Sequence, residues 1–111
     1  ERAPPYVMLS DGSVRNAYTL KLIDKRREAV TYSLALDAPP GLRLVVQDVA
    51  ADADGRPVLV SVPDGVGQFR ALVTAPAGQR LEPNTRIHFR LLDATGRAVA
   101  SADSAFLAPA R

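Results

Sequence analysis

The sequence of 111 residues predicts an all-β protein built as an antiparallel β-sandwich of about seven to eight short strands. Apolar and polar residues alternate with a period of two along most of the chain, and no segment keeps the longer period of a helix. Turn-forming Pro-Gly and Asp-Gly pairs interrupt the alternation at the spacing typical of a sandwich. The connections are too short for the helical crossovers that a parallel sheet requires.

The first half of the chain contains four of the expected strands. Their residues are Tyr6–Leu9, then Tyr18, Leu20 and Leu22, then Val30, Tyr32, Leu34 and Leu36, then Leu42, Leu44 and Val46. In the turn before the second strand, Asp11 and Ser13 are expected to bind nearby backbone while Gly12 takes a positive φ. Asn16 is expected to cap a backbone kink at the start of that strand. Asp24–Glu28 is a charged connection short enough for a hairpin.

The second half of the chain continues the same pattern. The alternating sets are Val58, Val60 and Val62, then Phe69, Ala71 and Val73, then Ile87, Phe89 and Leu91, then a last strand around 98–105 that ends in Phe106 and Pro109. Such clean alternation is typical of antiparallel sheets with one face dry and the other in water. An immunoglobulin-like sandwich follows, without the inter-sheet disulfide and buried Trp of antibody domains, because the chain has neither Cys nor Trp.

Composition limits both the architecture and the chemistry. With 47% apolar and 23% charged residues, the segment 1–111 is expected to form a single globular domain. The net charge is only +2, and no basic run is interleaved with aromatic residues, which argues against nucleic-acid binding. The absence of Cys excludes disulfides, thiolate zinc sites and cysteine-bound iron–sulfur clusters within this segment.

No residue pattern indicates catalysis, a bound cofactor or a resident metal, so the domain is not expected to be an enzyme. His88 is the single histidine and alternation turns it outward, so a triad or a metal site has no partners for it. Asp52 and Asp54 lack the remaining ligands of a calcium loop and are expected to form a solvated turn. No small-molecule substrate is evident.

Basic residues supply the one candidate interaction surface. Lys25, Arg26 and Arg27 form a basic tip, flanked by Asp24 and Glu28, that could touch a protein partner or anionic lipid head groups. His88 is a further surface candidate.

The segment Leu9–Lys25, reading LSDGSVRNAYTLKLIDK, carries a resemblance to a known family. With Pro40-Gly41, Pro76-Ala77-Gly78 and the closing Phe106 to Pro109, it resembles the C-terminal immunoglobulin-like domain of the FixG/CcoG cytochrome oxidase accessory proteins. The family commonly has Asn where this chain has Asp24, a mild departure at the expected hairpin corner.

The resemblance implies that the segment is the excised C-terminal domain of a larger bacterial membrane protein. Such proteins hold [4Fe–4S] clusters on cysteines upstream of this domain and assist assembly of cbb-type cytochrome oxidase through copper handling. The parent would lie in the inner membrane, with this domain on the periplasmic side.

Two kinds of function, and a third more general one, follow from these considerations. In the first, the domain docks onto an oxidase subunit or another assembly factor. In the second, it takes part directly in copper delivery and binds metal through Met8, His88 or the Asp52 and Asp54 loop. The third is a generic extracytoplasmic sandwich for adhesion or carbohydrate association.

Overall fold

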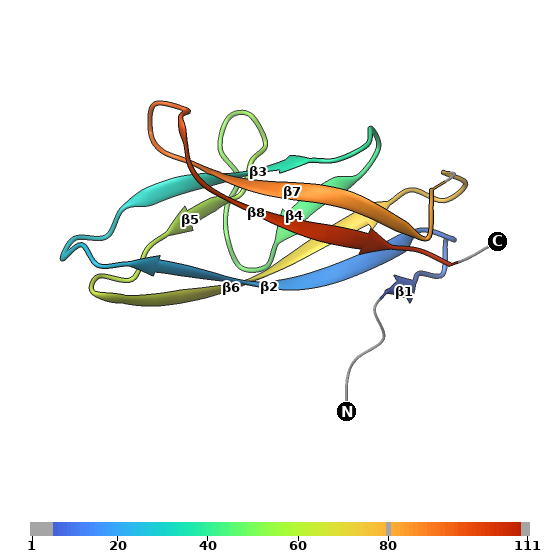
Figure 1. Cartoon of the computed structure of the whole chain (residues 1–111), viewed down its shortest axis with the longest axis horizontal. Coiled ribbons are helices and arrows are strands. Elements are labelled where there is room, and N and C mark those ends of the chain that lie inside the picture. Colours follow the sequence, from blue (N-terminus) through green and yellow to red (C-terminus); the bar gives the residue numbers. More distant parts are fainter. Residues whose placement is uncertain (1–5, 80, 110–111) are drawn as a thin grey trace.

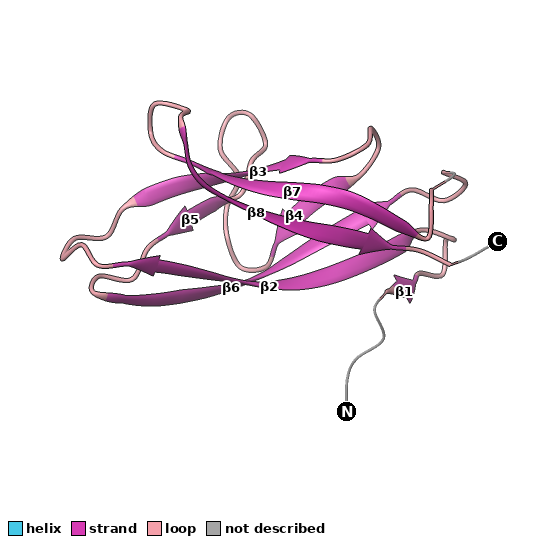
Figure 2. Ribbon diagram, in the orientation of Figure 1, coloured by secondary structure: helices cyan, strands magenta, loops and turns pink. Residues whose placement is uncertain are grey.

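A computed structural model gives the fold and describes residues 6–79 and 81–109 (Figure 1). Eight strands and no helix make up this part of the chain (Figure 2), which confirms the predicted all-β class. The strands are β1 (Val7–Met8), β2 (Val14–Asp24), β3 (Thr31–Asp37), β4 (Arg43–Val46), β5 (Val58–Val60), β6 (Gly65–Ala75), β7 (Asn84–Leu92) and β8 (Ala98–Leu107). The predicted domain 1–111 extends into residues 1–5, 80 and 110–111, which lie outside the described residues.

The strands form two four-stranded antiparallel sheets that pack face to face. The first sheet has the order β1-β2-β6-β4 and the second has the order β5-β3-β7-β8. The longest ladder joins β2 to β6 along the whole of β2, from Val14 opposite Ala75 to Asp24 opposite Gly65. Only β1–β2 and β7–β8 are neighbours both in sequence and in a sheet, so every other connection crosses between the sheets.

The expected hairpin at Asp24–Glu28 is therefore wrong. The segment carries the chain from β2 in one sheet to β3 in the other. Alternation shows which face of a strand is buried. It does not show whether two successive strands pair within one sheet or lie in opposite sheets and face each other across the core. Here Asp24 is buried at the corner, where it accepts hydrogen bonds from the Arg26 N–H and the Tyr32 hydroxyl, each at 2.9 Å.

The core lies between the two sheets and uses most of the inward faces that alternation predicts. Phe106, Ile87 and Val73 are its largest fully buried side chains. Partly buried residues of β2 pack against it, and the Tyr18 ring meets the Phe89 ring edge-on across the sheets, with centroids 5.2 Å apart. Aromatic pairs favour this arrangement because the positive edge of one ring meets the negative face of the other.

The expected apolar set of β5 is out of phase by one residue. Leu59 and Ser61 are buried, whereas Val60 and Val62 are 48% and 45% exposed. The run Val58 to Val62 is apolar on both faces except at Ser61, so its composition does not indicate which face turns inward. Ser61 fixes the register instead, because its hydroxyl oxygen accepts the Val30 N–H at 2.9 Å while its own N–H binds the Val30 carbonyl.

Candidate functional site

Two side chains of β2 fasten the sheets together at one end of the β8 edge. The Asn16 amide donates to the Leu107 carbonyl and accepts from the Leu107 N–H, both at 2.9 Å. The Tyr18 hydroxyl donates to the Ala105 carbonyl at 2.8 Å. Asn16 is buried inside β2, so its expected role as a cap on a local kink is wrong. A sequence read locally could not supply a partner 91 residues away.

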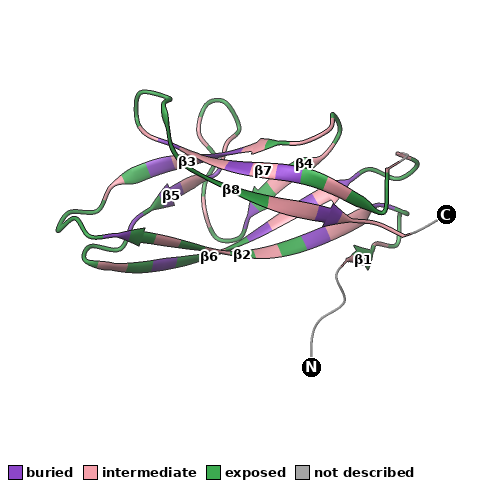
Figure 3. Cartoon of the chain, in the orientation of Figure 1, coloured by how far each residue is buried: buried purple, intermediate pink, exposed green. Residues whose placement is uncertain are grey.

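Beyond this clasp the edge of the sandwich is open. Residues 98–103 of β8 are all exposed, in contrast to buried Phe106 near the end of the same strand (Figure 3). The inward positions in this half are Ala102 and Ala100, opposite Phe89 and Leu91 of β7. Alanine side chains are too short to reach the facing sheet, so they leave the space beside Phe89 and Leu91 unfilled.

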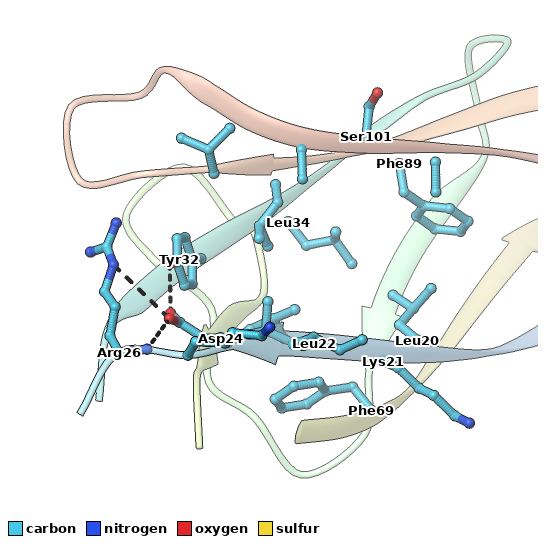
Figure 4. A pocket seen from close by; sticks show the side chains of 17 residues that line it. Leu20, Lys21, Leu22, Asp24, Arg26, Tyr32, Leu34, Phe69, Phe89 and Ser101 are labelled. Atoms are coloured by element: carbon cyan, nitrogen blue, oxygen red, sulfur yellow. Dashed lines mark hydrogen bonds and ion pairs between the residues drawn. The ribbon is translucent and has the colours of Figure 1, made fainter. Parts of the chain in front are cut away.

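The result is a cleft of about 470 Å³ between β2 and β8. Figure 4 shows Leu20 and Leu22 on β2 facing Phe89 and Leu34, with Ser101 of β8 at the rim. Most of the other side chains that line the cleft are apolar as well. It is therefore an apolar groove with one long open side.

A polar cluster closes one end of the cleft. Asp24 binds the Arg26 N–H and the Tyr32 hydroxyl, and the Arg26 Nε lies 4.0 Å from its Oδ1. The Arg26 N–H holds the pKa of Asp24 below its usual value, assisted by the Tyr32 hydroxyl, although burial of the carboxyl acts in the opposite direction. Burial raises the pKa of Tyr32, and the neighbouring Asp24 carboxylate raises it further. The carboxylate is thus already engaged, and the Lys25 and Arg26 side chains make this end of the cleft basic. Lys21 of β2 points away from the cleft (Figure 4).

The structure separates the four residues of the predicted interaction surface. Lys25 and Arg26 line the cleft, and Arg27 is exposed in the same connection. His88 lies on the outer face of β7, where its Nδ1 pairs with Asp103 of β8. The basic connection and His88 therefore do not form one surface.

The residues considered for metal binding also lie on separate elements. Met8 is on β1 and His88 is on β7, while Asp52 accepts hydrogen bonds from the Ser33 hydroxyl and the backbone N–H groups of Asp54 and Arg56. Within 6–79 and 81–109, no three or more His, Cys, Asp or Glu side chains gather closely enough to hold a metal ion. Asp52 instead stabilises its own turn.

The turn before β2 has the predicted geometry. The Asp11 carboxylate accepts from the Ser13 N–H at 2.9 Å and from the Ser13 hydroxyl at 2.6 Å, and Gly12 has a φ of 91°. These bonds hold the pKa of Asp11 below its usual value. They give the turn a structural role and leave the cleft as the candidate site.

Sequence reasoning missed this cleft because its apolar walls look like ordinary core residues. One signal was present. The last strand reads AVASADSAF, so its inward positions are small where the facing strands carry Leu and Phe. A strand with small inward residues at the edge of a sandwich indicates a space that the chain does not fill.

Residues 1–109 match the protein-family model described as "IG-like fold at C-terminal of FixG, putative oxidoreductase". The chain belongs to this FixG C-terminal family. The match covers almost the whole sequence, and it confirms both the family resemblance and the immunoglobulin-like fold. The domain is accordingly the accessory, immunoglobulin-like part of FixG-type proteins.

Curated relatives agree with this assignment. The chain is 40% identical over 83 residues to the nitrogen fixation protein FixG of Rhizobium meliloti, covering 74% of this chain and 16% of the relative. It is 38% identical over 97 residues to protein RdxA of Cereibacter sphaeroides, covering 86% of this chain and 20% of the relative. The chain thus spans a fifth or less of the length of these two relatives.

A solved structure shows the same fold. The crystal structure of a FixG-related protein from Vibrio parahaemolyticus superposes with a TM-score of 0.67, at 22% identity, over 86% of this chain and 80% of the other. Within the described residues of the present chain, no helix is long and apolar enough to cross a membrane.

Proposed function

We propose that this domain is a non-catalytic docking module of a longer FixG-like iron–sulfur membrane protein. The protein would assist assembly of cbb-type cytochrome oxidase through copper handling, and the domain would contact an oxidase subunit or assembly factor on the periplasmic side of the inner membrane. Membership of the FixG C-terminal family supports the kind of parent protein.

The open cleft is the observation that carries the docking role. A 470 Å³ apolar groove at the edge of a sandwich is a surface that a partner can bury. The groove holds one carboxylate, Asp24, which is already bonded to Tyr32 and Arg26, and it has no nucleophile paired with a base. Its chemistry therefore suits contact better than bond making.

The iron–sulfur clusters of the proposed parent do not fit this domain. Such clusters are held by cysteine thiolates, and the 111 residues contain no Cys. Any cluster would be bound by another part of the longer protein, so no redox step is assigned to residues of this chain.

A binding experiment tests the docking role. The 111-residue chain, immobilised on resin, is incubated with purified cbb-type oxidase subunits and assembly factors, and an unrelated immunoglobulin-like sandwich serves as the control. We expect one component to be retained at least tenfold above the control. Equal retention on both resins would contradict the proposal.

A further inference from the structure

The first half of β8 has an unpaired edge. β8 is the last strand of its sheet, and an edge strand presents a row of free N–H and C=O groups. The clasp shows which residues turn their main-chain N–H and C=O groups toward the free edge, because Asn16 binds both main-chain groups of Leu107 and Tyr18 binds the Ala105 carbonyl. Main-chain direction alternates along a strand, so Asp103 and Ser101 present their groups on this same edge.

No side chain of the described residues covers that part of the edge. The clasp ends at Ala105, and the next inward residues of β2 are Leu20 and Leu22, which cannot form hydrogen bonds. β1 gives no cover either, because it pairs only with Val14 and Arg15 of β2. Two open strand edges therefore border the cleft along its length.

The cleft is suited to the side chains of an added strand. Successive side chains of a strand point to opposite faces, so a strand paired with β8 would turn every second one into the groove. There they would meet Leu20, Leu22 and Phe89, which already line it. The remaining side chains would point to solvent.

The charge at the rim indicates the chemistry of the occupant. Lys25 and Arg26 lie at one end of the cleft, and Asp24, its one acidic lining residue, is occupied by Tyr32 and Arg26. The Lys21 side chain points away from the groove (Figure 4). Asp103 lies on the outer face and pairs with His88. A segment with an acidic residue at this end would be favoured, because complementary charge speeds encounter and rejects cationic competitors.

We propose that the cleft binds an extended segment of a partner protein with an acidic end, which adds as an antiparallel strand to β8 at Ser101 and Asp103. Alternate apolar side chains of the segment fill the groove, and a carboxylate at its end faces Lys25 and Arg26. Main-chain hydrogen bonds supply affinity in this mode, and the groove supplies specificity. The inference rests on the proposed docking function and names the site and the partner's chemistry.

Random dodecapeptides displayed on phage are the probe for the test. They are selected on the 111-residue chain, and the best binder is then synthesised for titration. We expect the selected peptides to carry apolar residues at alternate positions and Asp or Glu at one end. Binding should fall at least tenfold in Ala102→Trp, which fills the groove, and stay within threefold in Ala17→Trp, which adds the same ring at an exposed position of β2. Equal binding by both variants would overturn the proposal.

Backbone methylation tests strand addition directly. Only every second amide of an added strand can face β8, so two versions of the peptide are made with N-methyl groups in alternate registers. One version should lose binding at least tenfold, and the other should bind within threefold of the parent peptide. Equal effects of the two registers would overturn the pairing with β8.

Other occupants would give different results, and each of them would overturn the proposal. Self-association in sedimentation that Ala102→Trp abolishes would assign the cleft to a second copy. Failure to select peptides, combined with binding of oleate in the groove, would assign it to an acyl chain.

Retention of an oxidase component by wild type and Ala102→Trp alike would refute the cleft but keep the docking function. Peptide binding without any retained oxidase component would support the cleft as a binding site but contradict the proposed docking onto the oxidase or its assembly factors.

Discussion

Replacing Asn16 by Ala removes the main fastening between β2 and the end of β8. The side chain is 2% exposed and makes two hydrogen bonds of 2.9 Å to Leu107, which is 91 residues away. Each such bond contributes about 1 kcal/mol net, and leaving a buried backbone group unpaired costs about 1–3 kcal/mol. Because Leu107 is only partly buried, water can satisfy some of this loss. We therefore expect Asn16→Ala to lower the free energy of unfolding by about 2–4 kcal/mol.

This change is large compared with the total stability of a small domain, which is about 5–15 kcal/mol. At about 4 °C per kcal/mol for a chain of this size, the melting temperature should fall by about 8–16 °C. Urea unfolding followed by circular dichroism gives the free energy, and hydrogen exchange of the Leu107 amide should accelerate in the variant.

Gln68→Ala is the matched control, since it removes an amide side chain from an exposed position of β6 in the same sheet. Its effect should stay within about 0.5 kcal/mol. A similarly small effect of Asn16→Ala, with unchanged exchange at Leu107, would refute the assignment of a clasp.

Three further predictions concern titration and packing. Burial raises the pKa of Tyr18 to about 12, so the contribution of this group to stability is complete below pH 10 and is lost as the pH rises toward 12. In thermal melts, the melting temperature of Tyr18→Phe should therefore fall less than that of wild type as the pH is raised. The Arg26 N–H lowers the pKa of Asp24, so its contribution is present above its ordinary pKa of 3.8 and is lost as the pH falls through the lowered value. Asp24→Asn should therefore be less stable than wild type at pH 7 and lose less on acidification, and parallel acid profiles would contradict this. Phe106 is fully buried, so Phe106→Ala should cost about 3–5 kcal/mol in urea unfolding, and a cost below about 1 kcal/mol would mean that it is not central to the core.

Local patterns were enough to predict the strands and most of their dry faces. The inward set of Phe69, Ala71 and Val73 is a good case, because most of its neighbours on the other face (Gln68, Arg70 and Thr74) are polar and so indicate which face is buried. Val58 to Val62 shows the limit of this reasoning. A run that is apolar on both faces does not indicate which face is buried, and a hydrogen bond from the Val30 N–H to the Ser61 hydroxyl decides the register.

Pairing between distant segments could not be predicted in the same way. The connection 24–28 is short enough for a hairpin, but buried Asp24 and its bond to Tyr32 stabilise a crossing between the sheets. Asn16 likewise acts through Leu107, which only the folded chain brings near. The basic connection was a sound candidate by charge, whereas the groove beside it depends on Ala100 and Ala102 lying opposite Leu and Phe.

Photocrosslinking through the β8 edge tests the central claim most directly. A benzophenone amino acid replaces Ser101, at the cleft rim, in the longer protein expressed in its own cells, and the same residue replaces Gln68 as the control. Irradiation should join position 101, and not position 68, to one extended segment with an acidic end in a single partner protein identified by mass spectrometry. The absence of an adduct at 101, or equal adducts from both positions, would contradict docking through the cleft.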